Sequence, residues 1–128
     1  MNADFPLRDE TREILSCAFA VPNELGHGFH EKPYENALVV EFRHRNIPFE
    51  LQKRFPLIYR TVQVGEFVPD LIVFGKVIVD TKTISKITDQ EVGQMLNYLR
   101  ITSLPVGLLI NFKNPRVDYQ RVVLAKKH

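Results

Sequence analysis

Charged residues stand at both ends of the most apolar part of this sequence. Asp70 immediately precedes the apolar residues 71–74, and Asp80 and Lys82 follow the apolar residues 77–79. Runs this apolar are typical of central strands covered on both faces, where an ionised group must be paired or bound to a metal ion. Because side chains alternate along a strand, Asp80 and Lys82 project to the same face. The pattern therefore predicts a charged site at the end of a buried strand.

The spacing around Gly75 predicts how these groups meet. Asp70 lies five positions before this glycine and Asp80 five positions after it, so a tight hairpin would place the carboxylates side by side. Close carboxylates repel each other, and an all-oxygen site suits Mg²⁺ or Mn²⁺, with the backbone carbonyl of Thr81 as a further ligand. Lys82 would then assist an attacking water or stabilise charge on a phosphate. The alternative is an Asp80–Lys82 ion pair that closes the strand end, with Asp70 capping a loop.

The composition sets the class of protein but does not indicate a partner. The 128 residues are 45% hydrophobic and 25% charged, which is typical of a folded chain, and they suit one domain over residues 1–128. A formal net charge of +2 makes no strong case for a charged partner. The single cysteine, Cys17, excludes an internal disulfide and fits a reducing compartment. Without a signal-peptide pattern or a membrane-spanning run, we expect a cytoplasmic protein.

Apolar residues spaced three and four apart predict three helices. The first runs from about residue 7 to 25, and we expect Pro22 to kink it or end it early. The second begins near Pro33 and ends near Asn46, a residue that accepts a left-handed backbone. The third opens at Thr88, where Glu91 completes a capping box.

Five stretches rich in branched and aromatic residues predict strands at 49–59, 66–74, 76–83, 106–112 and 117–124. Turns are expected at residues 60–65 and at Gly75. The resulting order, ααβββαββ, predicts an α+β fold with a mixed sheet flanked by helices. The third helix crosses over between two parallel strands with the usual right hand.

The charged residues and this element order together resemble the PD-(D/E)XK nuclease superfamily and its restriction-endonuclease-like core. Asp70, preceded by a proline, and Asp80, two positions before Lys82, resemble the signature itself. Residues 28–34, Gly-Phe-His-Glu-Lys-Pro-Tyr, fit the GxxExxY pattern that names a family within this superfamily. Residues 94–98, Gln-Met-Leu-Asn-Tyr, are similar to the QxxxY element of RecB-like nucleases. The resemblance covers about residues 11–123.

The resemblance implies roles for the acidic residues and the lysine. It implies that Asp70 and Asp80 are metal ligands and that Lys82 is the catalytic lysine. Asp80 stands where these proteins usually carry glutamate, which shortens the reach to the metal by one methylene. Glu31 would be the acidic residue contributed by an upstream helix, although a carboxylate at this position equally suits the N–H groups of a first helical turn.

The resemblance also assigns residues on the third helix. Gln94 would lie near the scissile phosphate, and Tyr98, four positions later on the same helix face, would support it. The alternative for Tyr98 is core packing with a solvated hydroxyl, and for Tyr34 we prefer that interpretation.

Basic residues gather in two parts of the chain despite the small net charge. Arg43 and Arg54 belong to the first group and are expected to contact substrate phosphates without reading sequence. The alternative is a solvated basic face. The full groups are Arg43, Arg45, Lys53, Arg54 and Arg60, and Arg116, Arg121, Lys126 and Lys127.

The sequence leaves two classes of function open, beside a structural α+β domain in which Asp80 and Lys82 form only an ion pair. The first is metal-dependent hydrolysis of phosphodiester bonds in DNA or RNA. The second is a non-catalytic module that binds nucleic acid or protein and retains the nuclease fold. A chain of this length carries no separate specificity domain, so we expect a partner protein or a second copy to supply substrate selection.

Overall fold

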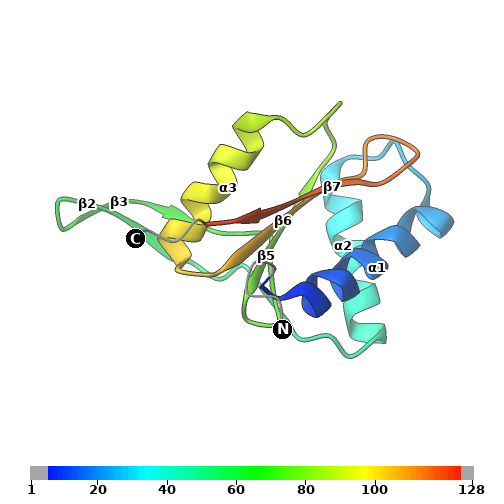
Figure 1. Ribbon diagram of the computed structural model, residues 1–128, viewed down its shortest axis with the longest axis horizontal. Helices are drawn as coiled ribbons and strands as arrows, with labels where there is room; N and C mark the ends of the chain where they lie inside the picture. The colour runs from blue at the N-terminus through cyan, green and yellow to red at the C-terminus, as the bar shows by residue number, and fades with distance from the viewer. Residues whose placement is uncertain (1–5, 125–128) are drawn as a thin grey trace.

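The computed structural model describes residues 6–124 and contains helices on both sides of a central sheet (Figure 1). Its elements follow in the order α1 (Arg8–Leu25), α2 (Glu31–His44), β1 (Phe49–Leu51), β2 (Phe55–Tyr59), β3 (Val62–Phe67), β4 (Leu71–Val73), β5 (Val77–Lys82), α3 (Asp89–Thr102), β6 (Val106–Asn111) and β7 (Asp118–Val123).

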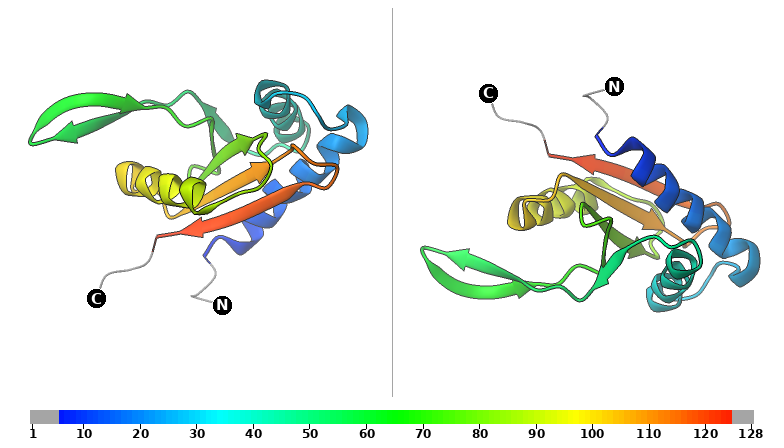
Figure 2. Two further views of the ribbon diagram at one scale, coloured as in Figure 1. Left: turned by 90° about the horizontal axis from the view of Figure 1, so that it is seen from above. Right: turned by 90° about the horizontal axis from the view of Figure 1, so that it is seen from below.

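Five strands form one mixed sheet in the order β1-β4-β5-β6-β7. β5 and β6 pair in parallel, and α3 connects them, whereas the other neighbouring pairs are antiparallel. α3 lies on one face of this sheet and α1 and α2 on the other, and β2 and β3 form a separate hairpin that projects from the body (Figure 2). The predicted mixed sheet flanked by helices is therefore confirmed.

The predicted number of strands before α3 was wrong, because two expected strands are each divided. The stretch 49–59 breaks between β1 and β2, where Gln52 has a left-handed φ of 55°. The stretch expected from residue 66 begins earlier, at Val62, and breaks between β3 and β4 at Pro69, which has no N–H to give to a ladder. The turn of the hairpin is shorter than predicted, since Arg60 and Thr61 alone complete it with φ of 48° and 66°.

The expectation that Pro22 ends the first helix early was also wrong. α1 continues to Leu25 and stops at Gly26, whose φ of 84° is left-handed. The helix holds its buried stripe through Val21, so packing against the sheet outweighs the backbone hydrogen bond that a proline removes. In α2, Pro33 lies in the first turn as expected, although the helix begins two residues earlier, at Glu31.

The two faces of the sheet bury separate apolar clusters. The cluster beneath α1 and α2 includes Val77 and Val79 of β5, and the cluster beneath α3 includes Ile78 of the same strand. Alternation along β5 therefore assigns Asp80 and Lys82 to the α3 face. α3 packs so closely on β6 that a Cβ atom added at Gly107 would stand 2.4 Å from the sulfur of Met95.

Candidate active site

A pocket of about 170 Å³ opens between the α3 face of the sheet and the base of the β2–β3 hairpin. Four side chains predicted to be catalytic, together with Tyr98, line it side by side. They come from the start of β4, the end of β5 and the middle of α3. The complete lining is Phe67, Val68, Pro69, Asp70, Ile78, Asp80, Lys82, Gln94 and Tyr98.

Asp70 and Asp80 face each other across the β4–β5 hairpin. Leu71 pairs with Val79, so the register continues directly to the two acidic residues. The backbone N–H of Thr81 donates to Asp70 Oδ2 at 3.2 Å, and its hydroxyl donates to the same oxygen at 3.4 Å. These bonds hold one carboxylate in place and turn it toward the other.

The environment of Asp80 favours its protonated form. Burial, followed by a hydrogen bond to Asp70 and the charge of Asp70, raises the pKa of Asp80 to about 7, against the opposing effect of Lys82. Without a cation beside it, Asp80 is therefore expected to titrate near neutral pH. Perturbed acids of this kind are typical of functional sites, although ion-pair networks produce them too.

Lys82 lies beside this pair and keeps its proton. Its Nζ lies 3.2 Å from Asp80 Oδ2. Burial lowers the pKa of Lys82, but the carboxylate of Asp80, joined by the charge of Glu31, outweighs burial and leaves that pKa above its ordinary value. The lysine is therefore a cation and hydrogen-bond donor in the pocket at neutral pH.

α3 supplies the remaining polar wall and is fixed at its start. The backbone N–H of Gln90 donates to the Thr88 hydroxyl at 3.3 Å, and the Glu91 carboxylate accepts from the Thr88 N–H at 2.7 Å, which is the predicted capping box. Gln94 lies one turn further on, exposed at the pocket. Tyr98 stacks on Phe67 with ring centroids 3.8 Å apart. Burial and then the charge of Asp80 raise the pKa of Tyr98.

The sequence did not indicate Asn111, which positions the segment after Lys82. This side chain is 1% exposed, accepts from the N–H groups of Ile84 at 3.1 Å and Lys113 at 3.2 Å, and donates to the Ile84 carbonyl at 2.7 Å. A polar residue at the end of the buried strand β6 is the signal that could have found it. Phe67 was also missed, because its stacking depends on how the hairpin folds back.

Other predicted site residues lie away from the pocket. Glu31 is exposed in the first turn of α2 and contributes charge to the site without lining it. Arg43 lies over the ring of Phe49, and Arg54 pairs with Glu66 at 2.6 Å. Within residues 6–124, no group of three or more His, Cys, Asp or Glu side chains is placed to share a metal ion. Lys126 and Lys127 of the C-terminal basic group lie outside the described residues.

Tyr34 packs in the core, as preferred, but its hydroxyl is not solvated as that interpretation supposed. The side chain is fully buried and stacks on Phe112 with ring centroids 4.6 Å apart. Its hydroxyl donates to the carbonyl of Gly26 at 3.0 Å and accepts from the N–H of Phe29 at 3.3 Å. Tyr34 therefore fixes the loop that leads into α2.

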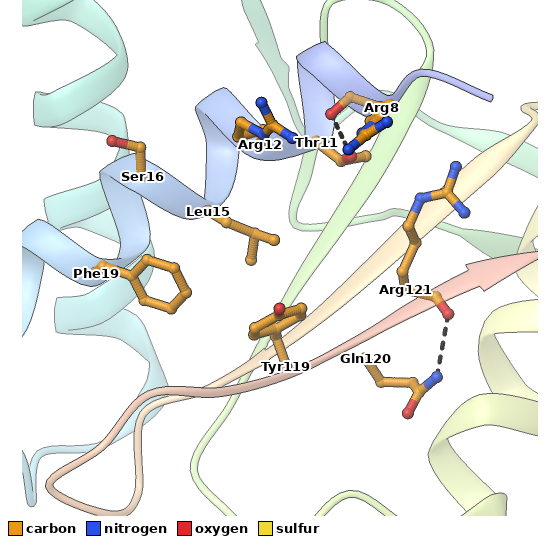
Figure 3. Close-up of a pocket in the computed structure, with 9 residues that line it drawn as sticks. All are labelled: Arg8, Thr11, Arg12, Leu15, Ser16, Phe19, Tyr119, Gln120 and Arg121. Carbon is orange, nitrogen blue, oxygen red and sulfur yellow. Dashed lines mark hydrogen bonds between the residues drawn. The ribbon is translucent and has the colours of Figure 1, made fainter. Parts of the chain in front are cut away.

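A larger groove of about 970 Å³ runs between α1 and β7 (Figure 3). It carries Arg8, Arg12 and Arg121 beside the aromatic pair Phe19 and Tyr119. Arginine does not ligate metal ions, and the lining contains no carboxylate, histidine or lysine. The carboxylates and the lysine predicted from the sequence therefore line the smaller pocket, on the opposite face of the sheet.

A family model for the PD-(D/E)XK nuclease superfamily matches residues 8–122. The chain belongs to this superfamily. Among solved structures, the chain is similar to one titled "Crystal structure of SSO0001", with 18% sequence identity and a TM-score of 0.57. The match covers 94% of this chain and 61% of that one. The likeness concerns the fold alone, and the chain spans only about 61% of that protein's length. No curated protein matches the sequence.

The oxygen donors of the pocket fit a hard divalent cation. Mg²⁺ is commonly held by one or two carboxylates with waters in its remaining positions, and Asp70 and Asp80 offer that set. Burial and then the neighbouring carboxylate of Asp70 raise the pKa of Asp80, and a bound cation would favour its ionised form. Across the described part of the chain, no helix has the length and apolar character that crossing a membrane requires.

Proposed function

We propose that this protein is a metal-dependent nuclease that hydrolyses phosphodiester bonds. The observation that carries the proposal is the pair of facing carboxylates, Asp70 and Asp80, with Lys82 Nζ 3.2 Å from Asp80. Membership of the nuclease superfamily supports a nucleic acid as the substrate, either DNA or RNA. The lone buried Cys17 is consistent with a cytoplasmic location, where it would stay reduced.

The residues of the pocket divide the chemical work. Asp70 and Asp80 would hold Mg²⁺ or Mn²⁺, with the Thr81 carbonyl as a further donor. The bound ion would supply Lewis-acid stabilisation of the phosphate and lower the pKa of a water. Lys82 would donate hydrogen bonds to the phosphate and offset the charge that develops on it, because its raised pKa makes it a poor base. Gln94 would donate its amide N–H groups to another phosphate oxygen.

The finer family assignment belongs to the same proposal. The GxxExxY pattern ends at Tyr34, whose hydroxyl holds the loop containing the pattern's glycine. Gln94 and Tyr98 both line the pocket, which supports the assignment of residues 94–98 to a QxxxY element. Glu31 would add negative charge near the metal, and Arg43 and Arg54 would contact phosphates further along the substrate. A partner protein or a second copy would supply substrate selection, which light scattering on the active species can test.

Calorimetry and cleavage assays on matched variants test the proposal. Wild-type protein should bind Mg²⁺ or Mn²⁺ and cut DNA or RNA. Asp80→Ala should lose both activities, and Lys82→Ala should keep metal binding but cut about 100- to 1000-fold more slowly. Asp118→Ala, which removes an exposed carboxylate on β7, is the control and should behave as wild type.

Two outcomes would reject the proposal in different ways. Wild-type protein that binds neither metal ion and cuts neither nucleic acid would leave Asp80 and Lys82 as a structural ion pair. Salt-dependent nucleic-acid binding that survives Asp70→Ala and depends on Arg43 or Arg54 would instead indicate the non-catalytic binding module.

A further inference from the structure

The β2–β3 hairpin exposes more apolar surface than a solvated arm requires. It projects beside α3 and extends past it (Figure 2). Ile58, Tyr59, Val62 and Val64 are 57–64% exposed, among the most exposed large apolar side chains in the described part of the chain. Tyr59 pairs with Val62 across the hairpin, so these two side chains share one face at the tip, whereas Ile58 belongs to the other face. Exposed apolar surface at such a tip indicates an interaction site. We therefore expect the hairpin to bind a partner molecule.

Charge and aromatic geometry on the hairpin indicate the chemistry of that occupant. Residues 49–68 carry three basic side chains and two acidic ones, which leaves a net charge of +1. Arg54 lies 2.6 Å from Glu66 and Lys53 lies 3.8 Å from Glu50, and Arg60 stands at the tip. The guanidinium of Arg60 lies 5.8 Å from the ring centre of Tyr59, and the ammonium of Lys53 lies 5.7 Å from that of Phe55. Proteins bind single-stranded nucleic acid with aromatic rings on which the bases stack and with nearby cations that contact the phosphates.

The hairpin is continuous with the pocket. β3 ends at Phe67, which lines the pocket and stacks on Tyr98, and the chain then passes through Val68 and Pro69 to Asp70. A strand of six residues is about 17 Å long, so Tyr59 and Arg60 lie roughly that far from the pocket rim. This length corresponds to about five nucleotides at the stacked rise of ~3.4 Å.

We propose that the β2–β3 hairpin is a binding arm for single-stranded nucleic acid that leads the strand from the tip, at Tyr59 and Arg60, to the pocket. The inference rests on the proposed function, because the pocket fixes one end of the path. A duplex keeps its bases stacked inside and offers mainly phosphates, so it would leave the apolar tip uncovered. The arm therefore discriminates single strands from duplexes and requires a minimum length, in addition to the selection that a partner protein or a second copy would supply.

Binding of labelled oligonucleotides of different lengths tests this arm. The proteins carry Asp80→Asn, which prevents cleavage and removes one carboxylate charge, and affinity for fluorescein-labelled oligo-dT is measured by anisotropy. Tyr59→Ala with Arg60→Ala should weaken binding of a 12-mer about tenfold or more. A 3-mer, too short to reach from the pocket to the tip, should bind equally to both proteins, and a 12-base-pair duplex should show little change.

Matched controls separate the arm from general effects. Arg12→Ala with Tyr119→Ala removes the same two residue types from the groove between α1 and β7 (Figure 3) and should bind the 12-mer within about twofold of its parent. Arg60→Glu reverses the charge at an exposed site and removes only the contact of the guanidinium with Tyr59. It should weaken binding of the 12-mer even if the double alanine variant unfolds. Tyr59→Phe should retain binding, since it keeps the ring.

Several results would overturn the proposal. An unchanged 12-mer affinity in the hairpin variants, an equal loss for the 3-mer or the duplex, or an equal loss in the control double variant would each do so. A halved molecular mass of the hairpin variant in light scattering would show that a second copy occupies the arm instead. Cleavage is assayed separately with Asp80 intact. If binding depends on oligonucleotide length but no metal-dependent cleavage occurs, only the catalytic function is rejected. If the hairpin variants neither bind the 12-mer more weakly nor cleave more slowly than wild type, only the arm is rejected.

Discussion

The two faces of the five-stranded sheet are closed to very different degrees. Among residues 6–124, seventeen buried apolar residues form the cluster beneath α1 and α2, and five form the cluster beneath α3. β5 contributes to both faces, with Val77 and Val79 on the closed side and Asp80 and Lys82 on the open side. The closed face therefore supplies stability, which allows the α3 face to keep charged groups that a packed core would exclude.

The largest expected effect on stability comes from breaking the closed face. Phe42 is fully buried there, and its ring centroid lies 5.9 Å from that of Phe49. Phe42→Ala should lower the free energy of unfolding by about 4 kcal/mol, measured by urea denaturation, because it leaves a cavity in a packed core. The metal affinity of the folded fraction should stay unchanged.

The control for this prediction lies on the same helix. Val40 is 63% exposed on α2, and Val40→Ala should change the free energy of unfolding by no more than about 0.5 kcal/mol. If Phe42→Ala also changed the metal affinity of the folded protein, the two faces of the sheet would be coupled and the proposed division between them would be wrong.

The buried carboxylate of Asp80 on the open face should make the stability of the protein depend on pH. The pKa of Asp80 is 3.8 in its ordinary state and about 7 in the folded, metal-free protein. Between these values the folded state binds more protons than the unfolded state, so raising the pH favours unfolding. We expect the free energy of unfolding to fall by about 3 kcal/mol between pH 4 and pH 7, measured by urea denaturation in EDTA.

Two additions sharpen this prediction. Asp80→Asn should remove the fall and make the protein more stable than wild type at pH 8, whereas Asp118→Asn, at an exposed site, should leave it. Mg²⁺ at 100 times its dissociation constant should restore about 2.7 kcal/mol at pH 8 in wild type only. A stability that is flat across this range in both proteins would show that burial and the neighbouring Asp70 do not raise the pKa of Asp80.

The sequence predicted the open face better than it predicted the strands around it. Alternation along one apolar run was enough to place Asp80 and Lys82 on one face, and symmetric spacing about Gly75 brought Asp70 beside them. These are local properties of a hairpin, so they need no knowledge of the rest of the fold. The division of the strands at Gln52 and Pro69 was missed, because residue preferences do not show where a ladder ends.

Contacts between distant segments could not be predicted at all. The stacking of Phe67 on Tyr98 and the bonds from Asn111 to Ile84 join residues 31 and 27 positions apart, respectively. Such contacts depend on how the hairpin, α3 and the sheet are oriented, and hydrophobic periodicity carries no information on that orientation. The residues that shape and position the site were therefore less visible than the residues expected to do its chemistry.

Asn111 provides the next test, because it joins the end of β6 to the segment that follows Lys82. Asn111→Ala would leave the partly buried N–H and carbonyl of Ile84 without this partner and should cost about 2 kcal/mol in the free energy of unfolding. Cleavage should slow with little change in KM, because Lys82 would be less well positioned while the substrate contacts remain.

The matched control bonds the same segment from the surface. Asn114 is exposed and donates to the Ser85 carbonyl at 3.1 Å, and Asn114→Ala should cost no more than about 0.5 kcal/mol. Asn111→Asp keeps the acceptor but loses the donor, so its kcat should lie between those of Asn111→Ala and Asn114→Ala. If kcat followed global stability alone across these variants, Asn111 would have no positioning role.

The smallest expected effect concerns the start of α3, the helix that rests on the smaller apolar cluster. Thr88→Ala removes the hydroxyl that accepts from the Gln90 N–H and should cost about 1 kcal/mol, while Thr88→Ser should restore stability. With few buried contacts to hold α3, the loss should appear as faster hydrogen exchange over residues 89–95 than in α2. Equal exchange rates in the two helices would mean that α3 is held as firmly as the helices of the closed face. The difference between the two faces would then lie in their side chains and not in the stability of their helices.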